Sequence, residues 1–208
     1  MLRAVIFDCD GVLFDSWRAN VAYYNAVLRQ MDLPPLSAEW EKRAHFMASS
    51  QVFDQLFADD PATLQQARQI ARAIDYGPFY DLMEPAPGLY PLLASLKRSY
   101  RLAMASNRGT TVQEVMRRFK LDAYLDLAVG VLDVARPKPH PDMIEKCLSH
   151  FDVAPGAAVY VGDAESDLAA ATAAGVHFVG VGDTPWTTRR VQQLHELRNQ
   201  LADLTASR

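Results

Sequence analysis

The sequence predicts an α/β fold, in which helices cover both faces of a parallel sheet and an all-α domain is inserted near the N-terminus. Three observations lead to this prediction. Short apolar runs bounded by Gly, Asn or Asp recur along the chain, and segments with helical periodicity separate most of them. This alternation is typical of buried parallel strands. Residues 16–85, in contrast, contain several helical patterns and no convincing strand.

Five short apolar runs are predicted as strands, at residues 4–7, 102–105, 127–131, 157–161 and 178–181. The helices between them are recognised by apolar residues at helical spacing. One such stripe consists of Val112, Val115, Met116 and Phe119, and another of Met143, Ile144, Cys147 and Leu148. A further helix over residues 168–174 ends at Gly175, which suits the C′ position.

The C-terminal segment predicts a final helix that begins at Thr184-Pro185. Its apolar side consists of Val191, Leu194, Leu197, Leu201 and Leu204. Apolar residues at helical spacing favour docking onto the sheet over a dimer seam. Both interpretations stay open, so we expect a monomer or a homodimer.

The insert is expected to hold four helices. Val21, Tyr24, Ala26, Val27, Leu28 and Met31 form the first apolar stripe, and Trp40, Ala44 and Met47 form the second. Ser49 or Ser50 can cap a third helix, and Asp60-Pro61 supplies an N-cap and a first-turn proline for a fourth. Linkers are predicted at Asp15-Ser16 and at residues 84–88. The expected domains are therefore an α/β core of residues 1–15 and 86–208, and a helical insert of residues 16–85.

Composition narrows the class of ligand. The 208 residues are 50% apolar with a net charge of −4, so the chain has no general attraction for polyanions and no nucleic-acid partner is expected. No run reaches the roughly 20 apolar residues of a membrane span, and no secretory segment is recognised. Cys9 and Cys147 have no metal-like spacing, and Cys9 is expected in the core. We expect a cytoplasmic protein with a small ligand and no membrane partner.

Two acids follow the first predicted strand directly. Side chains alternate between the faces of a strand, so Asp8 and Asp10 point to one side while Cys9 points to the other. Two neighbouring carboxylates repel each other unless a cation lies between them. Mg²⁺ prefers such oxygen ligands. The pair therefore predicts a Mg²⁺ site.

Polar residues also follow three of the other predicted strands: Ser106-Asn107 after the second, Lys138 beyond the third, and Asp163 with Asp167 after the fourth. The carboxyl ends of parallel strands share one edge of a sheet, where ligands bind. Several acids, a hydroxyl and a lysine in one place suit a metal-assisted site for a phosphate group.

These motifs in this order resemble the haloacid dehalogenase-like (HAD) hydrolase superfamily: Asp8-Cys9-Asp10-Gly11-Val12-Leu13, Ala105-Ser106-Asn107, Lys138-Pro139-His140-Pro141-Asp142, and Val161-Gly162-Asp163 with Asp167. The resemblance covers nearly the whole chain. It implies a Rossmann-like core, and the helical insert is similar to the type 1 cap of the phosphoglycolate phosphatase and β-phosphoglucomutase branch. A mobile cap of this kind would close over the substrate.

The resemblance also implies roles for the site residues. Asp8 would attack a phosphate monoester to give an aspartyl-phosphate, and Asp10 would act as the general acid and base. Ser106 would donate to a phosphoryl oxygen and Lys138 would balance negative charge. Asn107 and the amides of residues 9–11, including Gly11, could complete a phosphate cradle.

For the metal, the resemblance implies that Asp8, Asp163 and the backbone carbonyl of Asp10 ligate Mg²⁺. Asp167 would hold a metal-bound water or orient Lys138. Structural alternatives stay open: Asp8 as a turn residue, Ser106-Asn107 as a helix-capping loop, and Asp167 as an acid that suits a helix N-terminus.

Within the insert, Arg43 and His45 are candidates for binding the substrate because they lie where the family's caps often present a specificity loop. The alternative is an ordinary solvated helix face. Ala48 stands where many relatives carry a glycine.

The sequence therefore predicts a Mg²⁺-dependent phosphatase for a small phosphorylated metabolite. Family branches that cleave carbon–halogen or carbon–phosphorus bonds lack an acid at the position of Asp10, which excludes those chemistries. Two alternatives remain, a sugar phosphomutase and a non-catalytic module that binds phosphorylated ligands or a partner. Phosphoglycolate, a sugar phosphate, a nucleotide and pyrophosphate are all open as substrates.

Overall fold

A computed structural model describes residues 1–45, 47 and 49–206, without the side chains of His45, Ser49, Ser50 and Ala206. The chain forms two compact units. One, the α/β unit, comprises residues 1–15 and 85–208, and the other, the helical unit, comprises residues 16–84. Two short strands, β2 (Phe14–Asp15) and β3 (Glu84–Pro85), pair with each other where the sequence predicts linkers.

The α/β unit contains a six-stranded sheet with the order β5-β4-β1-β6-β7-β8. All neighbouring strands are parallel. The strands are β1 (Ala4–Phe7), β4 (Arg101–Ala105), β5 (Leu127–Val129), β6 (Ala158–Gly162), β7 (His177–Val181) and β8 (Arg190–Val191). Because β1 lies between β4 and β6 and every one of its residues is buried, it reads as a continuous apolar run.

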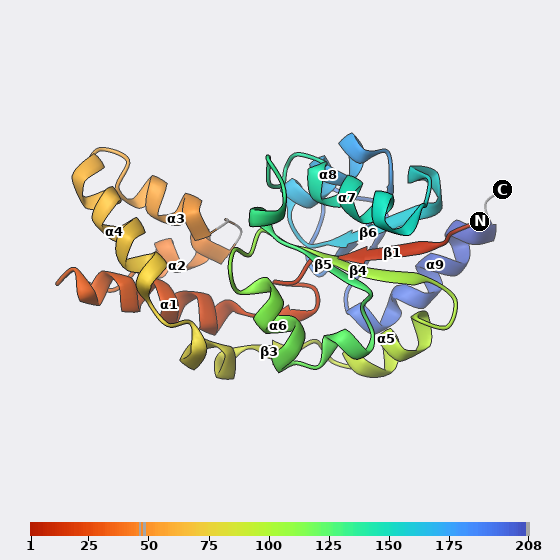
Figure 1. The fold of residues 1–208 in the computed structure, drawn as a ribbon, viewed down its shortest axis with the longest axis horizontal. Helices are drawn as coiled ribbons and strands as arrows, with labels where there is room; N and C mark the ends of the chain where they lie inside the picture. Colours follow the sequence, from red (N-terminus) through yellow and green to blue (C-terminus); the bar gives the residue numbers. More distant parts are fainter. Residues whose placement is uncertain (46, 48, 207–208) are drawn as a thin grey trace. The chain divides into compact units, whose positions relative to one another are not determined.

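Helices cover both faces of this sheet, which confirms the predicted fold class (Figure 1). On one face, α7 (Asp142–Phe151) packs against β1, β4 and β5, and α8 (Glu165–Ala174) packs against β6 and β7. The other face carries α5 (Leu89–Leu96), α6 (Val112–Arg118) and α9 (Leu197–Ala206). Short 3₁₀ turns cover Leu121–Ala123, Val131–Asp133, Pro155–Ala157 and Leu194–Glu196.

The core of the α/β unit is built by the predicted stripes. Met143, Ile144 and Cys147 of α7 are fully buried in one cluster with Ile6 of β1. Cys9 is also buried and free, as expected, and burial raises the pKa of its thiol. Gly175 ends α8 at a φ of +70°, where a residue without a Cβ is favoured.

One predicted element, the final helix, was wrong. The segment after Thr184-Pro185 does not form one helix: Arg190–Val191 is β8, and α9 begins only at Leu197. Hydrogen bonds from the amides of Gly180 and Gly182 to the carbonyls of Arg189 and Val191 draw this segment onto β7.

The predicted packing of that segment is nevertheless confirmed, because its apolar residues are all buried: Val191, Leu194, Leu197, Leu201 and Leu204. The third strand also ends earlier than predicted, at Val129. Residues 131–133 form a 3₁₀ turn in place of the predicted strand end, and the amide of Gly130 donates to the Asp133 carboxylate within that turn at 2.8 Å.

The described part of the helical unit consists of helices and turns up to Glu84 in β3. The α-helices are α1 (Trp17–Gln30), α2 (Ala38–His45), α3 (Ser49–Leu56) and α4 (Pro61–Ala73), followed by a 3₁₀ turn at Gly77–Leu82. They surround a core that includes Tyr24, Val27 and Phe53. Asp60 caps α4 as predicted, because its side chain accepts a hydrogen bond from the amide of Thr63 at 3.0 Å.

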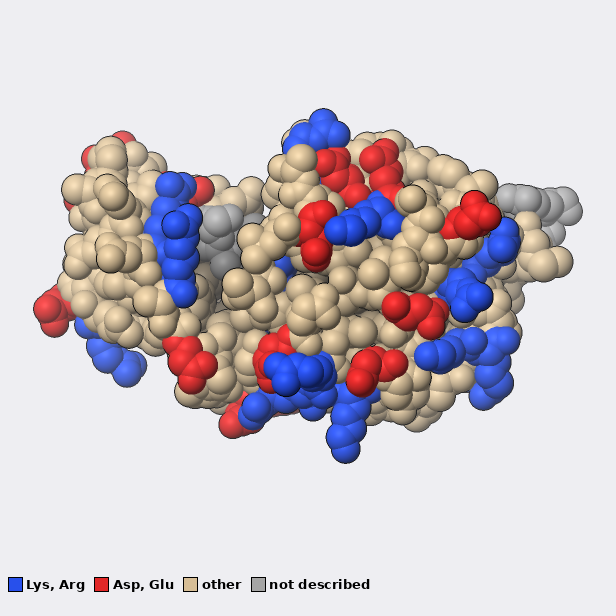
Figure 2. Space-filling model, viewed as in Figure 1, with Lys and Arg blue, Asp and Glu red and all other residues tan. Residues whose placement is uncertain are grey.

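The described helices include none with the length and apolarity that a bilayer crossing requires. Over the face of the α/β unit visible in Figure 2, Lys and Arg side chains are interspersed with Asp and Glu. That face therefore presents no extended field of one sign.

Candidate active site at the carboxyl edge of the sheet

Three adjacent strands end beside one another at the carboxyl edge of the sheet. Phe7, the last residue of β1, is in register with Met104 of β4 and Val161 of β6. The residues that follow these strands therefore meet at one edge, as the sequence predicts. Asp8 follows β1, Ser106 follows β4 and Asp163 follows β6.

Lys138 lies at the centre of this edge and is only 4% exposed. Its Nζ lies 2.8 Å from Asp8 Oδ1 and 2.7 Å from Asp167 Oδ1. It also donates to the hydroxyl of Tyr160 at 2.9 Å. These partners match the three donors of an ammonium group. The lysine and these acceptors, which we call the lysine centre, consist of Asp8, Lys138, Tyr160 and Asp167.

The position of Lys138 is set by two further contacts. The side-chain amide of Asn107 accepts from the Lys138 amide at 3.1 Å and donates to its carbonyl at 3.2 Å. The Tyr160 hydroxyl donates to the carbonyl of Ala105 at 2.7 Å. Asn107 and Tyr160 thus fix the backbone and the ammonium group of Lys138, respectively.

Tyr160 was not recognised from the sequence. It lies in a buried apolar strand, where it looks like an ordinary core residue. The available signal was its hydroxyl, because a buried tyrosine usually requires a hydrogen-bond partner for that group.

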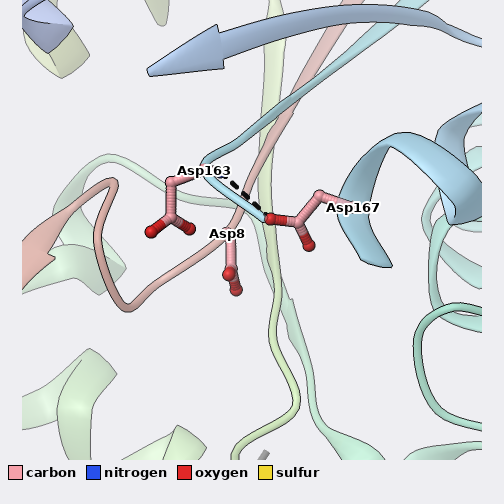
Figure 3. A group of neighbouring side chains, drawn as sticks. All are labelled: Asp8, Asp163 and Asp167. Atoms are coloured by element: carbon pink, nitrogen blue, oxygen red, sulfur yellow. Dashed lines mark hydrogen bonds between the residues drawn. The ribbon is translucent and has the colours of Figure 1, made fainter. Parts of the chain in front are cut away.

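The carboxylates of Asp8, Asp163 and Asp167 form a cluster in which one oxygen from each lies within 4.8 Å of the others. Asp8 and Asp163 project side by side from neighbouring chain segments, and Asp167 comes from α8 (Figure 3). Asp167 Oδ2 accepts hydrogen bonds from the amides of Asp163 and Ala164, both at 3.1 Å, while its Oδ1 faces Lys138. Both oxygens of Asp167 are thus engaged, which suits a residue that orients Lys138.

Burial perturbs the charged groups of this cluster. It raises the pKa of Asp8 to about 7, with Lys138 opposing the shift and Asp167 and Asp10 adding to it. Burial also raises the pKa of Asp163 well above its ordinary value, and the Asp8 charge contributes. For Lys138, burial acts to lower the pKa, but the charges of Asp167 and Asp8 outweigh it and hold the pKa well above its usual range.

The donor set fits a divalent cation. Asp8 and Asp163 bring carboxylates together in a buried place, where the charge of Asp8 adds to the raised pKa of Asp163, and a cation would relieve this repulsion. The absence of a side chain at Gly11 leaves room for the Asp163 carboxylate, because a Cβ at position 11 would collide with it. Carboxylate oxygens are the ligands that Mg²⁺ prefers.

Asp10 forms a second charged contact that the sequence interpretation missed. Arg108 donates to it through two bonds, from Nε to Oδ2 at 2.9 Å and from an Nη to Oδ1 at 2.6 Å. The Arg108 side chain is 7% exposed and that of Asp10 is 32% exposed. We call these two residues the arginine pair. The signal for Arg108 was its place directly after Ser106-Asn107.

The residues predicted as a phosphate cradle are already engaged within their loops. The amide of Cys9 donates to Asp8 Oδ1 at 2.7 Å, and that of Gly11 donates to the carbonyl of Phe14 at 2.8 Å. Asn107 is occupied by the backbone of Lys138. The hydroxyl of Ser106, which is 1% exposed, accepts from the amide of Arg108 at 3.3 Å and keeps its own proton to donate.

The candidate residues of the insert lie in the helical unit. Arg43 belongs to α2 and is exposed; its guanidinium stacks on the ring of Trp40 at 4.3 Å and donates to Gln55 at 3.0 Å. The side chain of His45 lies outside the described part of the chain. Their binding roles therefore stay predictions.

Known proteins resemble this chain over most of its length. A probable phosphatase IndB from Dickeya dadantii is 29% identical, over 97% of this chain and 89% of the relative. Phosphoglycolate phosphatase from Escherichia coli K12 is 25% identical, over 86% and 81%. The crystal structure of a HAD-superfamily hydrolase of subfamily IA from Geobacter sulfurreducens superposes with a TM-score of 0.79 at 37% identity and covers 96% of both chains.

The family assignment itself rests on residues 5–181, which match the haloacid dehalogenase-like hydrolase family. The match runs from β1 to the end of β7 and so includes all the site residues described above. The resemblance read from the sequence motifs is thereby confirmed, and the chain belongs to the haloacid dehalogenase-like hydrolases.

Proposed function

We propose that the protein is a Mg²⁺-dependent phosphatase that hydrolyses a small phosphorylated metabolite through an aspartyl-phosphate on Asp8. The observation that carries this proposal is the surrounding of Asp8, whose carboxylate lies 2.8 Å from Lys138 and beside the carboxylate of Asp163. The named phosphatases among the relatives support hydrolysis of a phosphate ester.

In the first half of the reaction, a carboxylate oxygen of Asp8 attacks the phosphorus, and the bond from phosphorus to the ester oxygen breaks. The leaving alcohol takes a proton from Asp10. Lys138 stays beside Asp8 and balances the charge of the transferring group. Ser106 donates a hydrogen bond from its hydroxyl group to a phosphoryl oxygen.

In the second half, water attacks the phosphorus of the aspartyl-phosphate and gives a proton to Asp10, which restores the acid. Phosphate leaves and Asp8 is a free carboxylate again. Asp10 thus gives one proton and takes one back in each cycle. Its carboxylate is held by Arg108 in this structure, so it has to turn during the cycle.

Asp8, Asp163 and the backbone carbonyl of Asp10 are the residues that would hold Mg²⁺. When bound, the ion supplies positive charge that stabilises the transferring phosphoryl group. Asp167 and Lys138 keep the carboxylates of the cluster in place around it.

The helical unit is proposed as the cap that selects the substrate, with residues 16–85 as its sequence limits. Support comes from the short paired strands β2 and β3 at its two connections. Cap closure predicts slower amide hydrogen exchange in the helical unit when a phosphate mimic and Mg²⁺ are added. Unchanged exchange there would contradict it.

The activity is tested by measuring orthophosphate release from a panel of phosphate monoesters and pyrophosphate. Release is expected with Mg²⁺ and should be lost with a chelator and in Asp8→Asn. Chromatography of the organic product distinguishes hydrolysis from isomerisation: an isomerised phosphate ester in place of orthophosphate would favour a mutase. Full turnover by Asp8→Asn would contradict the proposed nucleophile.

A further inference from the structure

A cavity of about 310 Å³ lies at the amino edge of the sheet, at the opposite end of β1 and β4 from the candidate active site. Arg3 precedes β1 and Arg101 opens β4, and the amide of Arg101 donates to the carbonyl of Arg3 at 2.9 Å. The rest of the lining comes from the segment between α5 and β4 and from the residue before β5: Lys97, Arg98, Ser99, Tyr100 and Asp126. We call this the amino-edge cavity.

The amino-edge cavity is lined by four cations and one acid, although the chain as a whole carries a net charge of −4. The acid, Asp126, is already engaged, because its Oδ2 accepts from the amide of Leu102 at 3.2 Å and its Oδ1 lies 3.7 Å from Lys97. Lys97 also donates to the carbonyl of Ala123 at 3.0 Å. Within residues 1–45, 47 and 49–206, three guanidinium groups of the cavity have no hydrogen-bond or ion-pair partner: those of Arg3, Arg98 and Arg101.

Ordinary structural roles account for only part of this positive charge. Lys97 is the C-cap of α5 and Arg98 follows it, where cations suit the negative end of the helix dipole. Charged residues also protect the edge strands of sheets, but β1 and β4 each have a strand on both sides. Arg3 and Arg101 therefore serve neither purpose, and their side chains are available to a ligand.

We propose that the amino-edge cavity binds a short chain of phosphoryl groups, either as a free oligophosphate or as the tail of a nucleotide. Guanidinium groups bind phosphoryl oxygens through two bonds, and cations on two neighbouring strands can hold oxygens that point in different directions. The volume lies at the low end of the range for small-molecule sites, roughly 300–1,000 Å³. A bound anion would also relieve the repulsion among the four cations.

This site is separate from the active site. The five residues of β4 between the two edges span roughly 16 Å, which exceeds the Debye length of about 8 Å at physiological ionic strength. A change of charge in the amino-edge cavity should therefore leave turnover unaltered. The inference does not depend on the proposed function, because none of the lining residues belongs to the proposed catalytic machinery.

Isothermal titration calorimetry of the full chain with tripolyphosphate tests the proposal. The titration is done with a chelator, because the acids of a metal-free active site disfavour a polyanion. One tripolyphosphate per chain is expected, with a Kd below about 1 mM at about 50 mM salt and weaker binding at higher salt. The same titration with ATP distinguishes the source of the ligand. Equal affinities indicate a free oligophosphate, and at least about 10-fold tighter binding of ATP indicates a nucleotide.

Two arginine variants locate the bound anion. Arg3→Gln and Arg101→Gln should each weaken tripolyphosphate binding by about 3- to 10-fold, and the double variant by at least about 10-fold. Arg72→Gln removes an exposed arginine of α4, makes the same change in net charge and should keep the wild-type affinity. Both cavity residues are exposed, so the variants should fold, and orthophosphate release at the wild-type rate confirms that they do.

The proposal is overturned if no saturable binding occurs up to about 1 mM tripolyphosphate. It is also overturned if Arg3→Gln and Arg101→Gln bind tripolyphosphate as tightly as Arg72→Gln, because the anion would then lie elsewhere on the protein. Neither outcome affects the phosphatase assignment, which depends on orthophosphate release with Asp8 and Mg²⁺. Absence of release from every ester would reject the proposed function and leave the calorimetric result unchanged.

Discussion

The lysine centre and the arginine pair both place a buried cation against a carboxylate at the same edge of the sheet, but they are built differently. Lys138 is 4% exposed and has partners from three segments: Asp8 after β1, Tyr160 in β6 and Asp167 in α8. Arg108 gives two strong bonds to Asp10, which is partly exposed.

This difference separates two tasks of a catalytic site. A cation held by several rigid elements cannot move without breaking them all, so the lysine centre is preorganised for the nucleophile. A cation whose two strong bonds go to a partly exposed acid is restrained less firmly, because that acid can turn toward solvent. The lysine centre therefore suits a fixed role, and the arginine pair suits a role that changes within the cycle.

The largest effect is expected for Asp8→Asn. It removes the proposed nucleophile from the lysine centre while Asp167 still balances Lys138, so kcat should fall on the order of 10⁴-fold with little loss of fold. Orthophosphate release and far-UV circular dichroism measure the two properties. Asp126→Asn, a charge change at a partly exposed site before β5, is the control. A decrease in kcat of less than about 10-fold would show that Asp8 is not the nucleophile.

The next largest effect is expected for Lys138→Met, which leaves the buried carboxylates of Asp8 and Asp167 facing each other. Breaking a buried pair on one side costs about 3–5 kcal/mol of unfolding free energy, and activity should fall by at least about 100-fold. Urea unfolding measures the loss of unfolding free energy, and orthophosphate release measures the loss of activity. Lys146→Met removes an exposed lysine that lies 3.7 Å from Asp133 and should cost less than about 1 kcal/mol.

If Lys138→Met were as stable as Lys146→Met, the proposed difference in rigidity between the lysine centre and the arginine pair would be contradicted. The lysine centre would then be no more rigid than a surface pair.

A smaller effect is expected for Tyr160→Phe. It removes one acceptor of Lys138 and the donor to the Ala105 carbonyl, while both acids stay in place. Loss of a buried hydrogen-bond partner costs about 1–3 kcal/mol, and a less restrained lysine should lower kcat by about 10-fold or less. Tyr100→Phe, just before β4, serves as the matched control. Unchanged kcat and stability would show that the two acids alone position Lys138.

How much of this could be read from the sequence differs between the two sites. The residues of the lysine centre that follow strands were predictable, because short buried strands identify their own ends and parallel strands share one edge. Asp8, Lys138 and Asp167 were found in this way. Tyr160 was missed because it lies within a buried strand. There, a tyrosine that only packs in the core and one whose hydroxyl binds Lys138 give the same sequence pattern.

The arginine pair was not predictable in the same way. Asp10 and Arg108 are far apart in the sequence and meet only because β1 and β4 are neighbours in register. A strand pattern predicts which residues reach the edge, but not which side chains turn toward each other across it. The prediction of one final helix was wrong for a related reason. The spacing of Val191 and Leu194 fits a helix and also fits a short strand followed by a turn, and pairing with β7 favours the strand.

The smallest expected effect concerns Mg²⁺ and pH, and it separates the lysine centre from the rest of the protein. Burial raises the pKa of Asp8 to about 7 and raises that of Asp163 as well. The metal-free folded state therefore holds more protons than the unfolded state, and its stability falls as pH rises from about 4 to about 7. Mg²⁺ competes with those protons, so it should bind more tightly at pH 8 than at pH 6.

Thermal unfolding with and without Mg²⁺, at constant ionic strength, measures this linkage. A tenfold change in metal affinity corresponds to about 1.4 kcal/mol at saturating metal, or about 3–6 °C in Tm for a chain of this size. The Mg²⁺-induced rise in Tm should thus be larger at pH 8 by about that amount. Asp163→Asn should abolish the rise, whereas Asp142→Asn, at a partly buried acid paired with Arg136, should keep it. Equal rises in Tm at both pH values would mean that Mg²⁺ does not displace protons from Asp8 and Asp163. The metal would then bind elsewhere than at these two acids.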